Sequence, residues 1–156
     1  MEEPYYKPIT KNETPVFITK DGKVKVRIIS GEFKNVKGII QHFTPVVTSV
    51  FEFEKEGEID FKIPAEYNTL IYVLDGELVI NSSETADDKT IVCFDNDEHS
   101  IKLKAKKKTN AILLAGQPIK EEVVSYGPFV LNNHNQVLQA LRDAQTGKMG
   151  VLIEEF

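Results

Sequence analysis

The segment from Phe61 to Ile80, FKIPAEYNTLIYVLDGELVI, decides the fold that the sequence predicts. It begins as an apolar strand, is interrupted by Pro64 and a polar turn, and continues as IYVLDGELVI through Asp75-Gly76. An Asp-Gly pair between apolar runs is a strong hairpin signal. We therefore expect two strands joined by a tight hairpin, a frame of the kind that presents metal ligands in some β-barrels.

The same period of two runs along most of the chain. KVKVRIIS alternates from residue 24, VFEFEKEGEIDFKIP alternates from residue 50, and HSIKLKAK alternates from residue 99. Such alternation predicts antiparallel strands with one solvated face. The apolar runs TLIYVL, TIVCF and AILLAG are typical of strands in the middle of a sheet, and Cys93 in TIVCF is expected to be buried and inert.

One segment has the helical period instead. Asn133 and Gln136 form a capping-box pattern, an apolar stripe follows, and Gly147 ends it, which predicts a helix at about 134–146. The fold class is therefore all-β: a cupin, or double-stranded β-helix (jelly-roll), barrel with one short C-terminal α-helix.

Length and composition favour one globular unit. The 156 residues are 41% hydrophobic and 28% charged, with a net charge of −5, which argues against nucleic acid or a membrane as partner. Residues 1–22 are polar and proline-rich and are expected to form an extended arm, with residues 23–156 as the domain. The sequence shows a single cysteine, no signal-like start and no long apolar run, so we expect an intracellular protein, cytoplasmic or nuclear.

The expected metal ligands are not found at the cupin positions. A cupin site uses histidines and one carboxylate, but counting back from Gly76 places Thr69 at the carboxylate position and Lys62 to Ala65 near the histidine positions. His99 is the one candidate ligand, and its neighbour Glu98 should point to the opposite face of the strand. We therefore predict no catalytic residue, no metal site and no cofactor. Lys62, Tyr67, Thr69 and His99 are the candidate ligand contacts at the barrel mouth.

Two further charge patterns have simple interpretations. The stretch KLKAKKK from residue 102 resembles a phosphate track, but its lysines alternate with core residues and no aromatic is interleaved, which favours a solvated hairpin. The acidic runs are typical of turns and wet strand faces. Pro128 cannot continue the ladder of a central strand, so we interpret the segment YGPFV, residues 126–130, as a corner where the chain leaves the barrel.

The C-terminal third carries a family resemblance. LLAGQPIKEEVVSYGPFVLNNHNQVLQALRDAQTGKMG resembles the end of the pirin family, which has a GxPLxEPV block, a GPFVMNT block, a short helix and GKFG. Upstream, KVRIISGEFKNVKG and IPAEYNTLIYVLDGE resemble further pirin segments, and EEPYYKPI resembles the connector between the two pirin domains. The signature positions, expected to be structural, are Gly116, Pro118, Glu121, Gly127, Pro128, Phe129 and Asn132.

The resemblance has consequences for function. Pirins are tandem cupins in which the N-terminal cupin holds the metal, usually iron, on three histidines and a glutamate, and the quercetin-oxidising activity of some members depends on that site. This chain resembles the C-terminal cupin, which generally has no metal. The resemblance thus implies a single cupin without a recognisable metal site, acting as a non-enzymatic protein-interaction or regulatory module.

Association and ligand binding remain open alternatives. A domain that usually packs against a second cupin exposes the corresponding face, so a homo-oligomer or a protein partner is expected. The alternative is a small-molecule-binding cupin, or a quercetinase-like dioxygenase with iron or another divalent metal on a non-standard site. A further alternative is a chain that works with a separate metal-bearing cupin.

Overall fold

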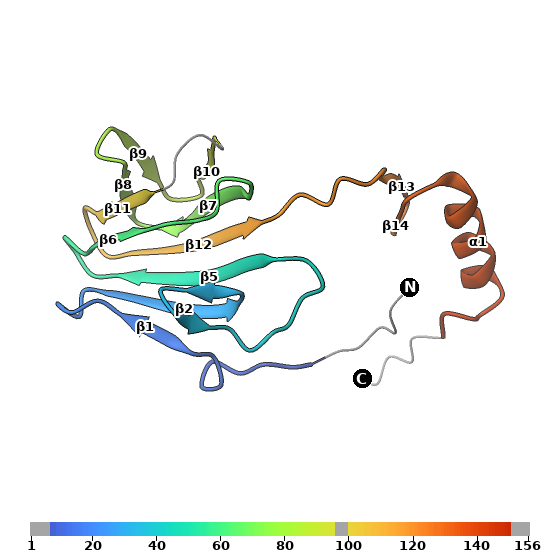
Figure 1. Ribbon diagram of the computed structural model, residues 1–156, viewed down its shortest axis with the longest axis horizontal. Helices are drawn as coiled ribbons and strands as arrows, with labels where there is room; N and C mark the ends of the chain where they lie inside the picture. Colours follow the sequence, from blue (N-terminus) through green and yellow to red (C-terminus); the bar gives the residue numbers. More distant parts are fainter. Residues whose placement is uncertain (1–6, 96–99, 151–156) are drawn as a thin grey trace. The chain divides into compact units, whose positions relative to one another are not determined.

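The computed structural model describes residues 7–95 and 100–150, which form two compact units. The first unit runs through Pro118 and contains two main antiparallel sheets, and the second begins at Ile119 and contains a hairpin and a helix (Figure 1). The boundary falls inside the range 23–156 that the sequence analysis treats as one domain. No helix in the described ranges is long and apolar enough to span a bilayer.

The larger sheet has six antiparallel strands. In spatial order they are β1 (Val16–Ile18), β2 (Val24–Ser30), β5 (Val46–Phe53), β12 (Thr109–Gly116), β7 (Asn68–Asp75) and β10 (Ile91–Phe94). Strand β1 lies within the predicted N-terminal arm and pairs with β2, so Val16 to Ile18 belong to the sheet. The TLIYVL and AILLAG runs occupy β7 and β12 inside the sheet, as predicted.

The smaller sheet has four antiparallel strands. Their order is β6 (Glu58–Phe61), β11 (Ile101–Ala105), β8 (Glu77–Ile80) and β9 (Glu84–Asp87), and a separate short hairpin joins β3 (Glu32–Phe33) to β4 (Val36–Lys37). The inward side chains of both large sheets meet in one hydrophobic core. At its centre the ring centroids of Phe51 from β5 and Phe61 from β6 are 5.6 Å apart, and the ring of Phe33 packs against both. The predicted cupin fold is confirmed, in the form of a two-sheet sandwich.

The Asp75-Gly76 pair does not form the predicted hairpin. Strand β7 belongs to the larger sheet and β8 to the smaller one, so Gly76 is the point where the chain crosses between them. Gly76 has φ +100°, and a Cβ there would lie 2.2 Å from Oγ1 of Thr109. The Thr109 hydroxyl in turn accepts a hydrogen bond from the Glu77 backbone N–H at 3.0 Å. The glycine is needed for this close crossing rather than for a two-residue turn.

The prediction for TIVCF is also wrong. Strand β10 is the edge of the larger sheet, and Cys93 is exposed. Val92 and Phe94 pack against the core, whereas Ile91 is 60% exposed on the opposite face. The run is continuously apolar because both faces of the strand carry apolar side chains. Only the face with Val92 and Phe94 packs against the core.

The second unit contains the segment interpreted as a corner. Strands β13 (Val124–Tyr126) and β14 (Phe129–Leu131) form an antiparallel hairpin in which Tyr126 faces Phe129. Gly127 and Pro128 are its two-residue loop, and Gly127 has φ +55°. The corner prediction is therefore corrected to a hairpin, since a positive φ at the first loop position suits a tight turn and Pro128 needs no ladder partner there.

The helix follows the prediction closely. Helix α1 (His134–Gln145) begins after Asn133, whose side chain accepts the Gln136 N–H at 3.0 Å. The Gln136 side chain returns to the backbone N–H of Asn132, one residue before the cap itself. At the other end Gly147 has φ +74° and its N–H bonds the Ala144 carbonyl, a glycine-terminated C-cap.

Candidate functional site

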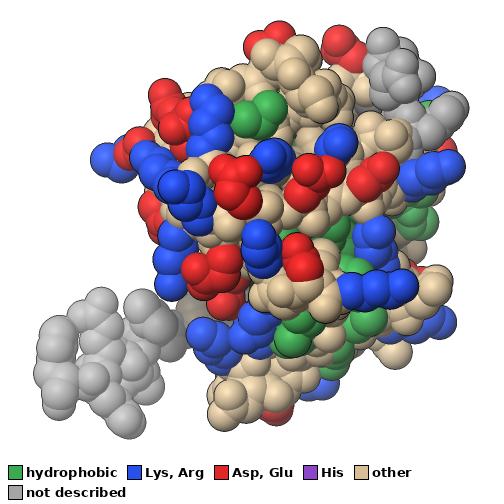
Figure 2. Space-filling model, turned by 90° about the vertical axis from the view of Figure 1, so that its left-hand side faces the viewer, with side chains coloured by type: hydrophobic (Ala, Val, Ile, Leu, Met, Phe, Trp, Pro, Cys, Tyr) green, Lys and Arg blue, Asp and Glu red, His purple; other side chains and the backbone are tan. Residues whose placement is uncertain are grey.

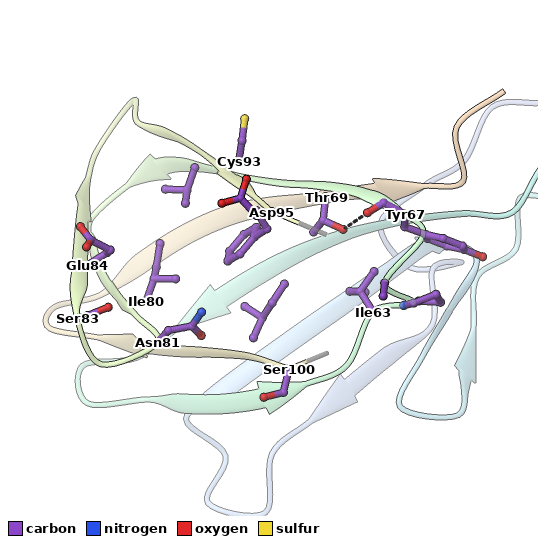
Figure 3. Close-up of a pocket in the computed structure, with 15 residues that line it drawn as sticks. Ile63, Tyr67, Thr69, Ile80, Asn81, Ser83, Glu84, Cys93, Asp95 and Ser100 are labelled. Atoms are coloured by element: carbon purple, nitrogen blue, oxygen red, sulfur yellow. Dashed lines mark hydrogen bonds between the residues drawn. The ribbon is translucent and has the colours of Figure 1, made fainter. Parts of the chain in front are cut away.

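A recess of about 240 Å³ opens between the sheets of the first unit (Figure 3). Its apolar wall consists of Ile63, Ile80, Val92, Phe94 and Ile101. The polar positions belong to the loop before β7, the turn between β8 and β9, and the segments on either side of residues 96–99. This is the mouth of the cupin sandwich, where the sequence analysis placed its candidate contacts.

The structure brings together two of the four predicted mouth residues. Tyr67 and Thr69 both line the recess, and the buried Thr69 hydroxyl donates to the Tyr67 carbonyl at 3.3 Å (Figure 3). Lys62 is not among the lining residues; it is exposed and borders another hollow with Phe33 and Asp60. His99 lies outside the described residues.

The described lining does not gather a metal-ligand set. Glu84 and Asp95 are its carboxylates, both exposed, and they come from different strands and segments. In Figure 3 the Cys93 sulfur points away from the other side chains of the recess. Within residues 7–95 and 100–150, no three His, Cys, Asp or Glu side chains are grouped in a way that could hold a metal ion. The described residues of the recess therefore do not fit a cupin-type iron site.

The two other histidines lie elsewhere. His42 borders a second, more open hollow of about 630 Å³ together with Glu32 and Lys37, whose charges pair at 4.0 Å. Tyr67 lines both hollows. His134 is the exposed first residue of α1 in the second unit.

The lysine-rich stretch forms ion pairs across the smaller sheet. Lys102 contacts Glu58 at 2.9 Å and Lys104 contacts Glu56 at 2.8 Å. The Lys104 hydrogen bond, helped by its charge, lowers the pKa of Glu56 below its ordinary value, and the same contact raises the pKa of Lys104. Figure 2 shows acidic and basic side chains intermixed on the end of the sandwich that carries these turns. Lys102 and Lys104 thus pair with glutamates on neighbouring segments at the surface, which agrees with the predicted solvated hairpin.

The outer side of the larger sheet has a different chemistry. Two cross-strand rows run over β5, β12, β7 and β10: Val50, Ile112, Tyr72 and Ile91, and Thr48, Leu114, Leu70 and Cys93. Ile91 is 60% exposed and Leu114 is 43% exposed, and Leu74 beside them is 39% exposed. We call the apolar members of these rows, with Leu74, the apolar face.

The rest of that outer side is polar or covered. Arg27 on β2 donates from its guanidinium to the Lys11 carbonyl at 2.6 Å and to the Thr14 hydroxyl at 2.8 Å. The segment from Lys11 to Thr14 therefore contacts Arg27 on β2. The sequence analysis missed this face because it assigned every continuous apolar run to burial. The signal was present: because successive side chains of a strand point to opposite faces, a continuous apolar run has apolar side chains on its outer side too.

The signature residues have structural contacts. In the second unit Asn132 donates from its side-chain amide to the Glu121 carboxylate at 2.8 Å and to the Glu122 carbonyl at 3.0 Å. Gly127 and Pro128 make the hairpin loop, and half-buried Phe129 pairs with Tyr126. In the first unit a Cβ on Gly116 would lie 3.0 Å from Val46, and Pro118 ends that unit. Two blocks of the signature, around Glu121 and Asn132, are thus joined by a hydrogen bond.

The sandwich, its core and its recess define a cupin domain. Residues 48–150 match the Pirin C-terminal cupin domain, and the chain belongs to the pirin family. It is 33% identical over 153 residues to a pirin-like protein of Solanum lycopersicum, covering 96% of this chain and 52% of that protein. It is 30% identical over 154 residues to the pirin of Homo sapiens, with the same coverage of 96% and 52%.

A solved structure gives the same relation. The structure described as quercetin 2,3-dioxygenase from Acinetobacter baumannii superposes with a TM-score of 0.89 at 28% identity, over 96% of this chain and 52% of that one. The chain therefore spans about half the length of the relatives it matches.

Proposed function

We propose that this pirin-like cupin acts through protein contacts, and that the apolar face of its larger sheet is the docking surface. The observation that carries the proposal is the exposure of Ile91, Leu114 and Leu74 on neighbouring strands, at 60%, 43% and 39%. Single exposed apolar residues are ordinary, but a contiguous apolar area on a sheet favours a protein interaction site. The face is built on strands rather than on loops, so docking needs no rearrangement of loops.

The opposite sheet serves as an internal reference. At the outward positions of β11 the chain has Lys102 and Lys104, both in ion pairs, where β12 has Ile112 and Leu114. Both sheets bury their inner side chains in the same core. The difference between the outer surfaces therefore reflects what each surface contacts outside the domain rather than what the fold requires.

The test compares matched variants in cells of the source organism. Leu114→Glu and Ile91→Glu each place a charge on the apolar face, and Thr85→Glu places the same charge on the exposed outer side of β9. Chemical cross-linking and mass spectrometry of the tagged chain should identify a protein, or further copies of this chain, bound to the wild type and to Thr85→Glu. We expect both face variants, Leu114→Glu and Ile91→Glu, to lose this cross-linked partner. A full set of partners retained by both face variants would contradict the proposal.

The recess favours a second candidate function, small-molecule binding. Its apolar wall and polar rim suit a small, partly hydroxylated ligand, and relatives in Thermoplasma acidophilum and Pseudomonas aeruginosa are described as putative quercetin 2,3-dioxygenases. Oxidation of quercetin by this chain would require a metal from a non-standard set or from a separate metal-bearing cupin. Elemental analysis of chelator-free protein, with a quercetin turnover assay, tests this function. Substoichiometric metal together with no turnover would exclude the metal-dependent form.

A further inference from the structure

We infer that the partner at the apolar face is a second copy of this chain, packed sheet against sheet about a two-fold axis. The inference rests on the proposed function, because it names the occupant of the same surface. In a two-fold arrangement one patch contacts the same patch on the other copy, so the patch must be compatible with itself in shape and charge.

The charges on the larger sheet satisfy that condition. Its outward charged side chains are two positive and two negative ones: Lys25, Arg27, Glu52 and Asp75. They cancel, and three of them are joined by the Lys25–Glu52 and Arg27–Glu52 pairs at 4.0 and 3.8 Å. Asp75 accepts from the Asn110 amide at 2.9 Å. Two copies can therefore approach at this surface without like-charge repulsion.

The outer surface of the smaller sheet is not compatible with itself in charge. Its outward positions hold four carboxylates, Glu58, Asp60, Glu77 and Asp87, against Lys102 and Lys104. The surface has an excess of two negative charges, and the whole chain has a net charge of −5. Two copies that met there would repel each other and would have to desolvate ion pairs. Charge thus permits self-association at the larger sheet and opposes it at the smaller sheet.

The size of the larger sheet is adequate for a dimer. The six strands contain 38 residues, which at about 4.8 Å strand spacing and about 3.4 Å rise per residue cover roughly 600 Å². This is comparable to the roughly 800 Å² that each partner contributes to a standard interface. Because the apolar face occupies only part of the sheet, we expect a micromolar dimer.

Cys93 provides a probe that needs no mutation. It is exposed, it lies in one of the two rows of the apolar face, and it is the one cysteine of the chain. Formation of the dimer should bury it. The alkylation rate of Cys93 by iodoacetamide should therefore fall at least about threefold between dilute and concentrated wild-type protein, with the same midpoint as the dimer transition.

The test combines that rate with sedimentation velocity over roughly 1 to 500 µM protein. Wild type and Thr85→Glu should dimerise. Leu114→Glu and Ile91→Glu should weaken the dimer at least about thirtyfold, because a carboxylate would be buried without a partner. Circular dichroism checks that each variant is folded. In both face variants the midpoint of the change in the Cys93 alkylation rate should move to a protein concentration at least about thirtyfold higher than in the wild type.

Two outcomes would overturn the inference. A wild-type chain that stays monomeric over the whole range, with a constant Cys93 rate, excludes the second copy. If the same chain still binds another protein in cells through Leu114, the proposed function stands and only this inference fails. A dimer that forms equally well in both face variants, with Cys93 still fully reactive, places the contact elsewhere and contradicts the inference, while the proposed function is then decided by the cross-linking experiment alone.

Discussion

On the outer side of β11 the chain places Lys102 and Lys104 opposite glutamates, whereas on the outer side of β12 it places Ile112 and Leu114 beside Tyr72 and Leu70. On the inner side the two sheets are alike, since both contribute aromatic and aliphatic residues to one core. The two sheets thus have the same kind of side chains on their inner faces, which pack the core. They have different kinds on their outer faces, which determine the external contacts. The comparison separates folding from recognition within a single domain.

The largest expected effect comes from the crossing between the two sheets. Gly76→Ala should destabilise the first unit by about 4 kcal/mol or more, because Gly76 has φ +100° and an added Cβ would lie 2.2 Å from Thr109 Oγ1. Gly22→Ala is the matched control: Gly22 has φ +70° but nothing within 4 Å of the added atom, so about 1 kcal/mol is expected. Urea unfolding measures both. Equal losses in the two variants would show that the close contact at Gly76 does not matter.

The next effect tests whether the inner faces are equivalent. Phe51→Ala in the larger sheet and Phe61→Ala in the smaller sheet should each cost about 3–5 kcal/mol of unfolding free energy, since both rings are at most 3% exposed. The double variant should lose less than the sum, because the ring centroids are 5.6 Å apart. Chemical denaturation of the three variants measures the coupling. If the losses of unfolding free energy in the two single variants simply added in the double variant, the two sheets would have separate cores and their inner faces would not be equivalent.

The smallest effect concerns the charged outer surface. Lys104→Met should raise the pKa of Glu56 towards its ordinary 4.5, because the Lys104 hydrogen bond is the main cause of the lowered value. A lowered pKa in the folded state adds stability above the unfolded pKa, and that contribution is lost as the pH falls through the folded pKa. Carboxyl ¹³C chemical shifts followed through an acid titration give the pKa. Lys102→Met, which removes the neighbouring pair with Glu58, is the control and should leave Glu56 nearly unchanged. A wild-type Glu56 that titrates at or above 4.5 would contradict the assignment.

Local patterns predicted the local structure well. The alternation at Val24, Val26 and Ile28 gave the inward face of β2, and all three are fully buried. Asn133 caps α1 as expected, since a cap depends on residues within one turn. Tyr67 and Thr69 do lie at the mouth of the sandwich, but Lys62 faces a different hollow. The alternation that places Phe61 and Ile63 inside places Lys62 outside, so the strand period predicts its direction and counting back from Gly76 does not.

The sequence by itself determined the strands, the helix with its cap, and the family signature, because side-chain alternation, capping and glycine conformation act over a few residues. Only the tertiary structure decided that Gly76 crosses between sheets, that Gly127 and Pro128 turn a hairpin, and that β10 is an edge with Cys93 exposed. Those features depend on which distant strand pairs with which. A continuous apolar run indicates that a strand has two apolar faces. The tertiary structure determines which face packs in the core and which face is exposed.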